Sequence, residues 1–449
     1  MTSADRIWSA RIWSDRIWST LSPAARTTAV AFLLAIATLP VLSRQYLGRT
    51  AGEIPIFMGG VEALLAGRLY GEHVFEYPPY ALIWFLAPYA WAPDDAERFR
   101  FAFGLQIWLF DAVIKAVLLW RGIRARQGVP DLIPFLVYSL GSAALGHMLL
   151  MKYDAVPAAL ALAGVLAVCG GRPFLGGAVT ALAAGSKAYP VLFIPILAVV
   201  AWRRSRHQFR RFALGVAVAA APLLLLALWL PWWNFASFHG SRGLEVGSLA
   251  ASIVWALHFL GVDASWGLVG TSNEVGGPLA DQLLAPARAI WVLYTLAALG
   301  VAVGTALRQV RLKADTTSDT QAGLKADVAI GGYPTAAPEV AALLLLPLVP
   351  FVATNTVFSP QFHLWLIPLA ALVLERRDTL PRAAVRAAWV IFIATMIVPT
   401  FYPSREYTLG LGLWRTVALL IRNGLLLYAA ICLVRMARDM RLTAAASGT

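Results

Sequence analysis

The chain has 449 residues, of which 59% are hydrophobic and 14% are charged, and its mean hydropathy is +0.68. This composition excludes an ordinary soluble domain and predicts an all-α, multi-pass membrane protein. The net charge of +13 does not indicate nucleic-acid binding, because Lys and Arg concentrate in short runs between apolar segments. The two cysteines, Cys169 and Cys432, lie inside apolar runs and predict neither a disulfide framework nor a metal site.

The first 26 residues are predicted to be a cytoplasmic, low-complexity tail. They repeat the tetrapeptide Arg-Ile-Trp-Ser three times at a spacing of five residues. Two interpretations stay open: a basic, Trp-bearing strip on the membrane surface, or an extension without a function.

The region 27–435 is predicted to form the transmembrane domain. A spanning helix needs about 20 mostly apolar residues. Candidate segments are 27–43, 79–93, 100–120, 131–151, 155–169, 174–186, 188–202, 212–231, 287–307, 339–357, 362–374, 383–401 and 413–434. The segment 79–93 is short and contains Pro88, so we expect it not to cross fully, which leaves about twelve spans.

Basic runs predict the orientation of the chain. The runs expected in the cytoplasm are 121–126, 203–211, the linker 308–338, 375–377 and the tail 436–449. Both termini are then cytoplasmic. The segments expected outside are the first loop 44–78, residues 152–154, 186–187, the large loop 232–286, 359–363 and 402–407. An alternative, in which 174–202 crosses only once, would invert residues 121–154.

The first outer loop is where we expect the chemistry. It carries acidic and imidazole side chains at Glu53, Glu62, Glu72, His73 and Glu76. Apolar residues recur at helical spacing from Phe57 to Leu69, which predicts a short amphipathic helix on the outer membrane surface. Such a helix would hold the Glu53 carboxylate at the boundary between water and lipid.

The Tyr77-Pro78-Pro79-Tyr80 segment has a rigid, extended backbone and two aromatic rings. It fits an interfacial anchor, and it also fits a wall against which a sugar or a lipid chain packs.

Three charges mark the later outer segments. Lys152 and Asp154 lie two residues apart at a junction of apolar segments, where they either compensate each other or face a substrate. Lys187 is an isolated charge in an otherwise neutral region, so it either snorkels to the interface or binds an anion such as a lipid phosphate.

The segment 359–365 interrupts two apolar runs with hydrogen-bonding groups, among them Gln361 and His363. Non-helical backbone near membrane depth is typical of a cavity lining. His363 is a candidate proton carrier, but no second His stands at ligand spacing, so we expect no metal site.

Several motifs together resemble the membrane glycosyltransferases of GT-C type, and within them glycosyltransferase family 87. The matching segments are Glu53-Ile54-Pro55-Ile56-Phe57, Ala63-Leu64-Leu65-Ala66-Gly67-Arg68-Leu69-Tyr70, Tyr77-Pro78-Pro79, Lys152-Tyr153-Asp154, Lys187-Ala188-Tyr189-Pro190 and Phe358-Ser359-Pro360-Gln361-Phe362-His363-Leu364-Trp365-Leu366-Ile367-Pro368. The chain departs from the family pattern at Glu53, where that pattern has Asp, and at Phe57, where it has Tyr.

The resemblance implies a GT-C-like bundle in the cell membrane. Its implied activity is transfer of a sugar, mannose in the family, from a polyprenyl-phosphate donor to a hydroxyl of a glycan or glycolipid acceptor on the outer face. The anomeric centre would be inverted. Glu53 would act as the general base, with Asp154 as a second catalytic carboxylate. No metal or other cofactor is required.

The remaining site residues are expected to bind substrate. Lys187, Lys152 and Arg68 would stabilise the charge on the leaving phosphate. Tyr77, Gln361 and His363 would complete the binding site.

Two other classes of protein fit the same sequence. A transporter or flippase of a lipid-linked or amphipathic substrate would show repeated halves with broken helices, and we see no clear internal repeat. A non-catalytic assembly protein that retains the scaffold would explain the departure at Glu53.

Overall fold

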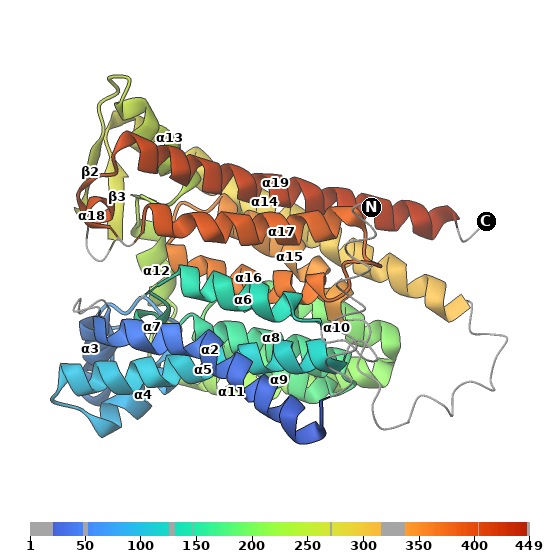
Figure 1. Cartoon of the computed structure of the whole chain (residues 1–449). Coiled ribbons are helices and arrows are strands. Elements are labelled where there is room, and N and C mark those ends of the chain that lie inside the picture. Colours follow the sequence, from blue (N-terminus) through green and yellow to red (C-terminus); the bar gives the residue numbers. More distant parts are fainter. Residues whose placement is uncertain are drawn as a thin grey trace.

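The computed structural model describes residues 21–47, 53–124, 131–146, 148–269, 272–315, 337–402 and 404–446. Long helices run side by side, and short elements gather at one end of the bundle (Figure 1). The triplicated Arg-Ile-Trp-Ser tract and most of the predicted linker 308–338 lie outside the described residues. The expectation of a helical, multi-pass membrane protein is confirmed, with one small β-sheet added to it.

The first half of the chain is helical throughout. Its elements are α2 (Pro23–Leu47), α3 (Ile54–Leu65), α4 (Ala81–Trp91), α5 (Ala96–Arg124), α6 (Ile133–Ala144), α7 (Met148–Met151), α8 (Ala155–Cys169), α9 (Pro173–Ser186), η1 (Tyr189–Leu192), α10 (Phe193–Arg204) and α11 (Arg206–Leu226).

The second half contains the sheet. Its elements are α12 (Asn234–Ser241), β1 (Leu244–Glu245), α13 (Leu249–His258), β2 (Ser265–Val269), β3 (Ser272–Gly276), α14 (Pro278–Asp315), α15 (Ala337–Ala353), η2 (Pro360–Phe362), α16 (His363–Leu374), α17 (Arg382–Ile397), η3 (Val398–Thr400), α18 (Arg405–Leu409) and α19 (Leu413–Ala446). The antiparallel strands have the order β1-β3-β2, and α12, α13 and the sheet all form within the predicted loop 232–286.

Helix length shows which elements are long enough to cross a membrane as one continuous helix. Within the described residues, five helices are long and apolar enough to cross: Ala96–Arg124, Arg206–Leu226, Pro278–Arg308, Arg382–Thr400 and Leu413–Met440. Helix α4 has 11 residues and is therefore about 16 Å long, roughly half the thickness of a bilayer core. This length agrees with the expectation that 79–93 does not cross, while the total of about twelve spans stays a prediction.

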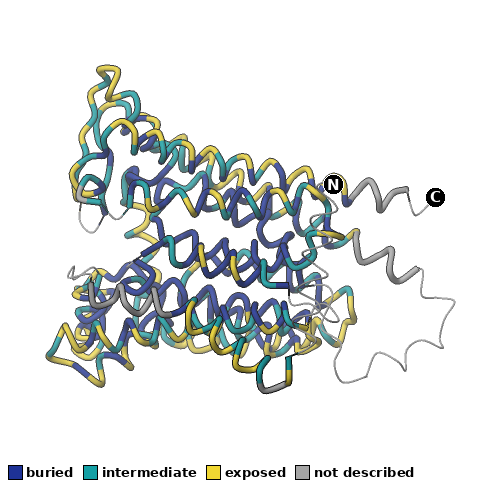
Figure 2. The backbone as a smooth tube through the Cα atoms, in the orientation of Figure 1, coloured by how far each residue is buried: buried dark blue, intermediate teal, exposed yellow. Residues whose placement is uncertain are grey.

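Burial divides the helices into a core and a periphery. Every residue of α16 is buried, and nearly all of α15 is (Figure 2). A helix that is apolar on all sides belongs inside a bundle. Helix α11 is the opposite case, because only Phe212 and Gly215 are buried along its length. Its exposed apolar residues, among them Leu214 and Leu224, are suited to contact lipid.

Glycines let α9 and α11 pack closely. A Cβ atom at Gly177 would lie 2.2 Å from the Phe212 carbonyl oxygen, and one at Gly215 would lie 2.1 Å from the Phe174 carbonyl oxygen. Small residues at such contacts allow two backbones to approach in a membrane. This contact fixes α9, whose C-terminal end precedes Lys187.

The segments predicted to share a side of the membrane do share an end of the bundle. Arg121 binds Glu375 through two hydrogen bonds of 2.9 Å, and Arg377 pairs with Asp131 at 2.5 Å. The first contact joins two runs that were predicted to be cytoplasmic, and the second ties one of them to the residues directly before α6. The predicted outer segments meet at the other end, where α3, α7, α12, α18 and the sheet gather (Figure 1). Which end faces the outside stays a prediction.

Candidate active site

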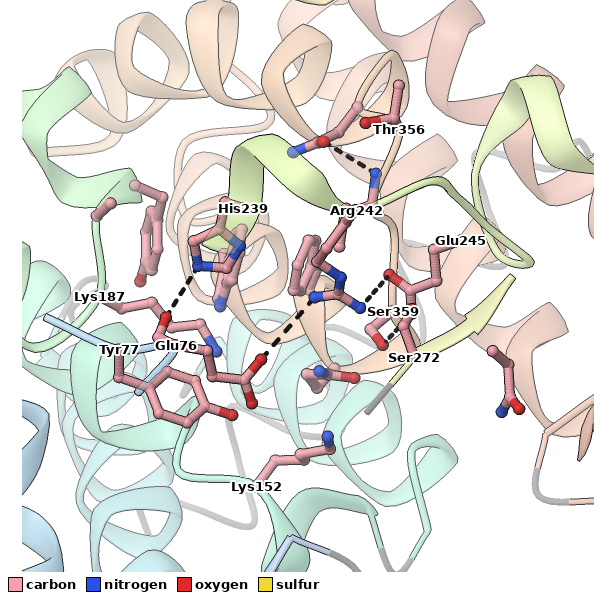
Figure 3. A pocket seen from close by; sticks show the side chains of 18 of the residues that line it. Glu76, Tyr77, Lys152, Lys187, His239, Arg242, Glu245, Ser272, Thr356 and Ser359 are labelled. Atoms are coloured by element: carbon pink, nitrogen blue, oxygen red, sulfur yellow. Dashed lines mark hydrogen bonds and ion pairs between the residues drawn. The ribbon is translucent and has the colours of Figure 1, made fainter. Parts of the chain in front are cut away.

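A cavity of about 1140 Å³ opens at the end of the bundle where the predicted outer segments meet. Its lining comes from the first outer loop, the α7–α8 junction, the segment after α9, the 232–286 loop and the segment before α16. Figure 3 shows charged side chains from these separate segments pointing toward one another. The sequence therefore predicted correctly which segments share one end of the molecule.

Glu53 lies directly before the first turn of α3, at the cavity surface. Its Oε1 forms an ion pair with the Lys152 ammonium, and its Oε2 accepts a hydrogen bond of 2.9 Å from the Tyr77 hydroxyl. Pro55 follows within the first turn of α3, where a missing N–H costs nothing. The helix start thus holds the carboxylate between a cation and a hydroxyl donor.

The end of α3 explains the glycine of the second motif. Gly67 has φ +70°, its N–H donates to the Leu64 carbonyl, and the Arg68 N–H donates to the Ala63 carbonyl. This is the Schellman ending of a helix, in which a left-handed residue satisfies the last carbonyls. The predicted short helix is present, although Leu65, expected on its apolar face, is exposed.

The chain between α3 and α4 is packed rather than open. Tyr70 is buried and has φ 62°, a conformation that is unusual for a residue other than glycine. Its hydroxyl donates to the Tyr77 carbonyl at 2.5 Å, and its own carbonyl accepts from the Asn234 amide at 2.9 Å. These bonds fix the Tyr77 backbone and tie the first loop to α12.

Lys187 forms the second acid–base pair. Its ammonium lies 2.8 Å from Asp154 Oδ1, which also accepts a hydrogen bond of 2.7 Å from the Trp365 indole. The Asp154 side chain is completely buried, whereas the Lys187 side chain is 14% exposed and lines the cavity.

Four aromatic rings surround the Lys187 ammonium. The ring centroids lie 4.8 to 5.9 Å from Nζ and belong to Tyr77, Tyr153, Phe362 and Trp365. Ring faces attract a cation at such distances. The buried Asp154 carboxylate therefore compensates the charge of Lys187, and the rings restrict the position of its ammonium.

Lys152 and Asp154 do not pair with each other, although two residues separate them in sequence. Tyr153, which stands between them, donates to the Ser186 carbonyl at 2.8 Å. Lys152 reaches toward the first loop, and Asp154 reaches toward Lys187. The interpretation of a mutually compensating pair is thus wrong, because the chain turns between the two residues.

The pKa of Lys152 is lowered to about 7. Burial is the main cause, and the positive charge of Lys187 adds to it, while Asp154 and Glu245 oppose the shift. The contact with Glu53 also favours the charged ammonium. Lys152 is therefore a group whose charge changes near neutral pH.

The structure adds a third charged group that the sequence did not single out. Arg242 lies between Glu76 and Glu245, at 4.0 Å and 3.9 Å, and His239 Nε2 lies 2.9 Å from the Glu76 carbonyl oxygen (Figure 3). Of these four residues, only Glu76 was noted from the sequence, as one of the acidic residues of the first loop. Arg242 and Glu245 stand in the loop predicted to be outside, but no sequence pattern indicates which residues of that loop line the cavity.

The remaining predicted site residues divide into two groups. Tyr77 and Gln361 line the cavity. Arg68 is exposed and does not line it. His363 is completely buried behind it, with Nδ1 2.9 Å from the Thr395 hydroxyl. Phe57, where the family pattern has Tyr, stacks on Phe85 with ring centroids 4.3 Å apart. In the described part of the chain, no three His, Cys, Asp or Glu residues are grouped to hold a metal ion.

Fold and site together define a polytopic, mainly helical membrane protein with a charged cavity at one end. The model of glycosyltransferase family 87 matches residues 75–272, a segment that contains Lys152, Asp154, Lys187 and Arg242 but not Glu53. This match confirms the resemblance to family 87 over residues 75–272, which contain the Tyr77-Pro78-Pro79, Lys152-Tyr153-Asp154 and Lys187-Ala188-Tyr189-Pro190 segments.

Among solved structures, the chain is similar to the crystal structure of ArnT from Cupriavidus metallidurans in the apo state. The identity is 14% and the TM-score is 0.44, over 92% of this chain and 78% of that chain. A comparison with curated proteins finds no match.

Proposed function

We propose that the protein transfers a sugar from a polyprenyl-phosphate donor to an acceptor hydroxyl, with inversion at the anomeric carbon. The family 87 region supports the class of reaction. The donor lipid, mannose as the sugar and the outer face of the cell membrane as the location follow from the sequence resemblance and the distribution of basic loops.

The observation that carries the proposal is that one cavity contains two acid–base pairs, one with a partly exposed carboxylate and one with a buried carboxylate. Glu53 presents a carboxylate at the cavity surface, and Lys187 presents an ammonium there while its own carboxylate partner is buried. Glycosyl transfer from a phosphate needs both groups: a base for the attacking hydroxyl and a cation for the leaving phosphate.

In the proposed reaction, Glu53 accepts the proton of the acceptor hydroxyl as that oxygen attacks the anomeric carbon. The new glycosidic C–O bond forms while the bond from the anomeric carbon to the phosphate oxygen breaks, through an oxocarbenium-like transition state. The electron pair leaves with polyprenyl phosphate. A single displacement of this kind inverts the configuration.

Lys187 is the group that we assign to the leaving phosphate. Asp154 orients it, and Tyr77 and Trp365 restrict where its ammonium can move. A cation fixed before the reaction stabilises developing negative charge without a reorganisation cost. Asp154 thus acts as a positioning residue, behind the reacting atoms.

Lys152 has a different proposed task. It neutralises Glu53 in the free protein and lies within reach of the same cavity. An arriving phosphate competes with Glu53 for this ammonium. Once Lys152 turns to the phosphate, Glu53 Oε1 is free to accept the proton of the acceptor hydroxyl.

The test uses the purified full chain in nanodiscs with polyprenyl-phosphate-mannose and a panel of hydroxyl acceptors. We expect transfer, a product of inverted configuration, and loss of transfer in Glu53→Gln. The matched control is Glu62→Gln, because Glu62 is exposed on the same helix. Unchanged transfer in Glu53→Gln would reject Glu53 as the base, and a retained configuration would reject the single displacement.

A second assay separates the enzyme from a transporter. Labelled donor is placed in one leaflet of liposomes that contain the protein, and both glycosidic product and donor movement are measured. Movement across the bilayer without any glycosidic product would replace the proposed function with transport.

A further inference from the structure

Among the described residues that line the cavity, seven buried polar atoms have no hydrogen-bond partner. Two are the Tyr189 hydroxyl and Arg242 Nε, and the other five belong to the sheet, η2 and α18. These five are Glu245 Oε2, Ser272 Oγ, Asn273 Oδ1, Gln361 Oε1 and the Tyr407 hydroxyl. All five residues line the cavity. We call this set the polar wall. Buried polar groups are nearly always hydrogen-bonded, so such a concentration at one surface indicates a place for a polar ligand.

The chemistry of these atoms narrows the class of ligand. The carboxylate of Glu245 and the amide oxygens of Asn273 and Gln361 only accept hydrogen bonds, while the hydroxyls of Ser272 and Tyr407 both donate and accept. A ligand that satisfies them needs several O–H donors at different positions. A sugar ring with neighbouring hydroxyl groups meets this requirement.

Charge argues against an anionic ligand at the same surface. Two arginines lie beside the polar wall among the described residues that line the cavity. Arg242 lies between the carboxylates of Glu76 and Glu245, and the Arg288 guanidinium donates a hydrogen bond to the Arg242 carbonyl. The carboxylates of Glu76, Glu245 and Glu274 outnumber these two guanidinium groups, since Arg242 faces the first two and Arg288 acts on the third. Glu245 Oε2 and the two amide oxygens add negative potential at the cavity. An anion would be repelled, and an uncharged polyol would not.

The polar wall is held rigidly by backbone contacts. Strand β1 pairs with β3, so Glu245 lies opposite Glu274, next to Asn273. The Glu245 N–H donates to the Thr356 carbonyl at 2.9 Å, and the Ser359 hydroxyl donates to Glu245 Oε1 at 2.5 Å. The sheet and the segment before α16 are therefore joined at the cavity.

Two further contacts lock this junction from behind. Gly247 approaches the Phe358 carbonyl so closely that a Cβ atom would lie 1.9 Å from its oxygen. The guanidinium of Arg422, from α19, donates to the Gly247 carbonyl at 2.6 Å and lies 3.8 Å from the centroid of the Phe358 ring. A preorganised wall of this kind suits specific binding, because little ordering remains to be done when a ligand arrives.

We propose that the polar wall is the acceptor subsite, and that it binds an uncharged, polyhydroxylated glycan. This inference rests on the proposed glycosyl transfer, which it deepens by naming the acceptor class. Glu76 connects the wall to the base, since it approaches Arg242 and immediately precedes Tyr77, whose hydroxyl binds Glu53. An acceptor bound at the wall therefore lies in the same cavity as Glu53.

The experiment measures glycan binding separately from transfer. The purified full chain in nanodiscs is titrated with neutral methyl glycosides, di- and trisaccharides and myo-inositol, and with a methyl glucuronoside as the anionic probe. Each neutral glycan is offered both free and as the head group of a glycolipid, which distinguishes a soluble from a lipid-borne acceptor. We expect at least one neutral probe to bind more tightly than the glucuronoside.

The decisive variants are Ser272→Ala and Asn273→Ala, because Glu245 also fixes Ser359 and its replacement risks misfolding. Each should weaken binding of the neutral probe roughly tenfold, as expected when one hydrogen-bond partner is removed. Ser265→Ala is the matched control, since Ser265 is exposed on the neighbouring strand β2. Donor binding should stay unchanged in all three.

Two results would overturn the inference. One is that no neutral probe binds the wild-type chain, or that the glucuronoside binds more tightly. The other is equal binding of the neutral probe to wild type and to both wall variants. Neither depends on whether transfer is observed, so the inference and the proposed glycosyl transfer fail or stand separately.

Discussion

Each of the two acid–base pairs at the cavity joins a carboxylate to a lysine ammonium, but the carboxylates differ in their exposure to the cavity. In the Glu53–Lys152 pair, both side chains are partly exposed, at 16% and 15%. In the Asp154–Lys187 pair, the lysine is 14% exposed and the carboxylate is completely buried. The first pair therefore offers a carboxylate to the cavity, and the second offers only an ammonium.

This difference shows how position divides the work between identical groups. A carboxylate at the surface can meet a substrate proton. A carboxylate behind a lysine can only orient it and compensate its charge. The family resemblance implied Asp154 as a second catalytic carboxylate beside Glu53, and in our proposal their different exposure gives them different roles.

The largest effect is expected at the exposed carboxylate. Glu53→Gln should lower kcat roughly 10²–10⁴-fold, the usual contribution of a general base. Glu53→Asp should retain part of the activity, because a base remains but reaches one methylene less far. The measurement is kcat with saturating donor, alongside the folded fraction. Equal activity of the Gln and Asp variants would show that basicity at this position is irrelevant.

The buried carboxylate should respond in stability and in donor binding. Asp154→Asn should lower the free energy of unfolding by about 2 kcal/mol, less than for a fully buried pair because Lys187 has access to the cavity. It should also raise KM for the donor, since Lys187 loses its orienting partner. Thermal unfolding and steady-state kinetics check this. Asp94→Asn, at an exposed position, is the control.

One result would show that Asp154 and Glu53 share the same role. If Asp154→Asn lowered kcat as strongly as Glu53→Gln while KM and stability stayed unchanged, Asp154 would itself be a catalytic group.

The lysine of the buried pair gives a smaller, graded effect. Lys187→Met should raise KM for the donor roughly tenfold, the loss expected for one charge-assisted contact. Lys187→Arg should lie between wild type and Met, because it keeps the charge but its planar head fits the four surrounding rings differently. Arg172→Met, exposed at the other end of α9, controls for charge loss. Equal KM values for the Met and Arg variants would exclude a role for the charge.

The smallest effect concerns pH. Because the pKa of Lys152 is lowered to about 7, this lysine is charged below pH 7 and loses its charge as the pH rises. Its attraction for an anionic donor should fall with it, and kcat/KM for the donor should drop roughly fivefold from pH 6 to pH 8, equivalent to about 1 kcal/mol. Lys152→Met should remove that drop. An identical pH profile in the variant would assign the titration to another group.

Much of the fold can be predicted from the sequence because local sequence features, such as apolar length, proline, glycine and basic runs, determine it. Apolar length predicted the helices, Pro88 and the short run 79–93 predicted the brevity of α4, and Gly67 marks the end of α3. Basic runs predicted which loops gather at each end. These signals act locally, so a single sequence contains them.

The side-chain pairs that join distant segments at the cavity could not be predicted from the sequence, and the reason is physical. Lys152 and Asp154 are close in sequence, but the chain turns at Tyr153, so they pair with different residues, Glu53 and Lys187. The direction of such a turn depends on tertiary packing and is not visible in a sequence pattern. Arg242 and Glu245 were missed likewise, since only the pairing of β1 with β3 turns that loop toward the cavity. The orientation of His363 away from the cavity depends on helix packing, which periodicity alone does not set.

The central claim, that the two pairs perform different tasks, is tested most directly by measuring donor Kd and the single-turnover rate in the same two variants. We predict that Glu53→Gln lowers the rate at least 100-fold with an unchanged Kd, and that Asp154→Asn mainly weakens donor binding. The account would be contradicted if Glu53→Gln weakened donor binding and left the single-turnover rate intact.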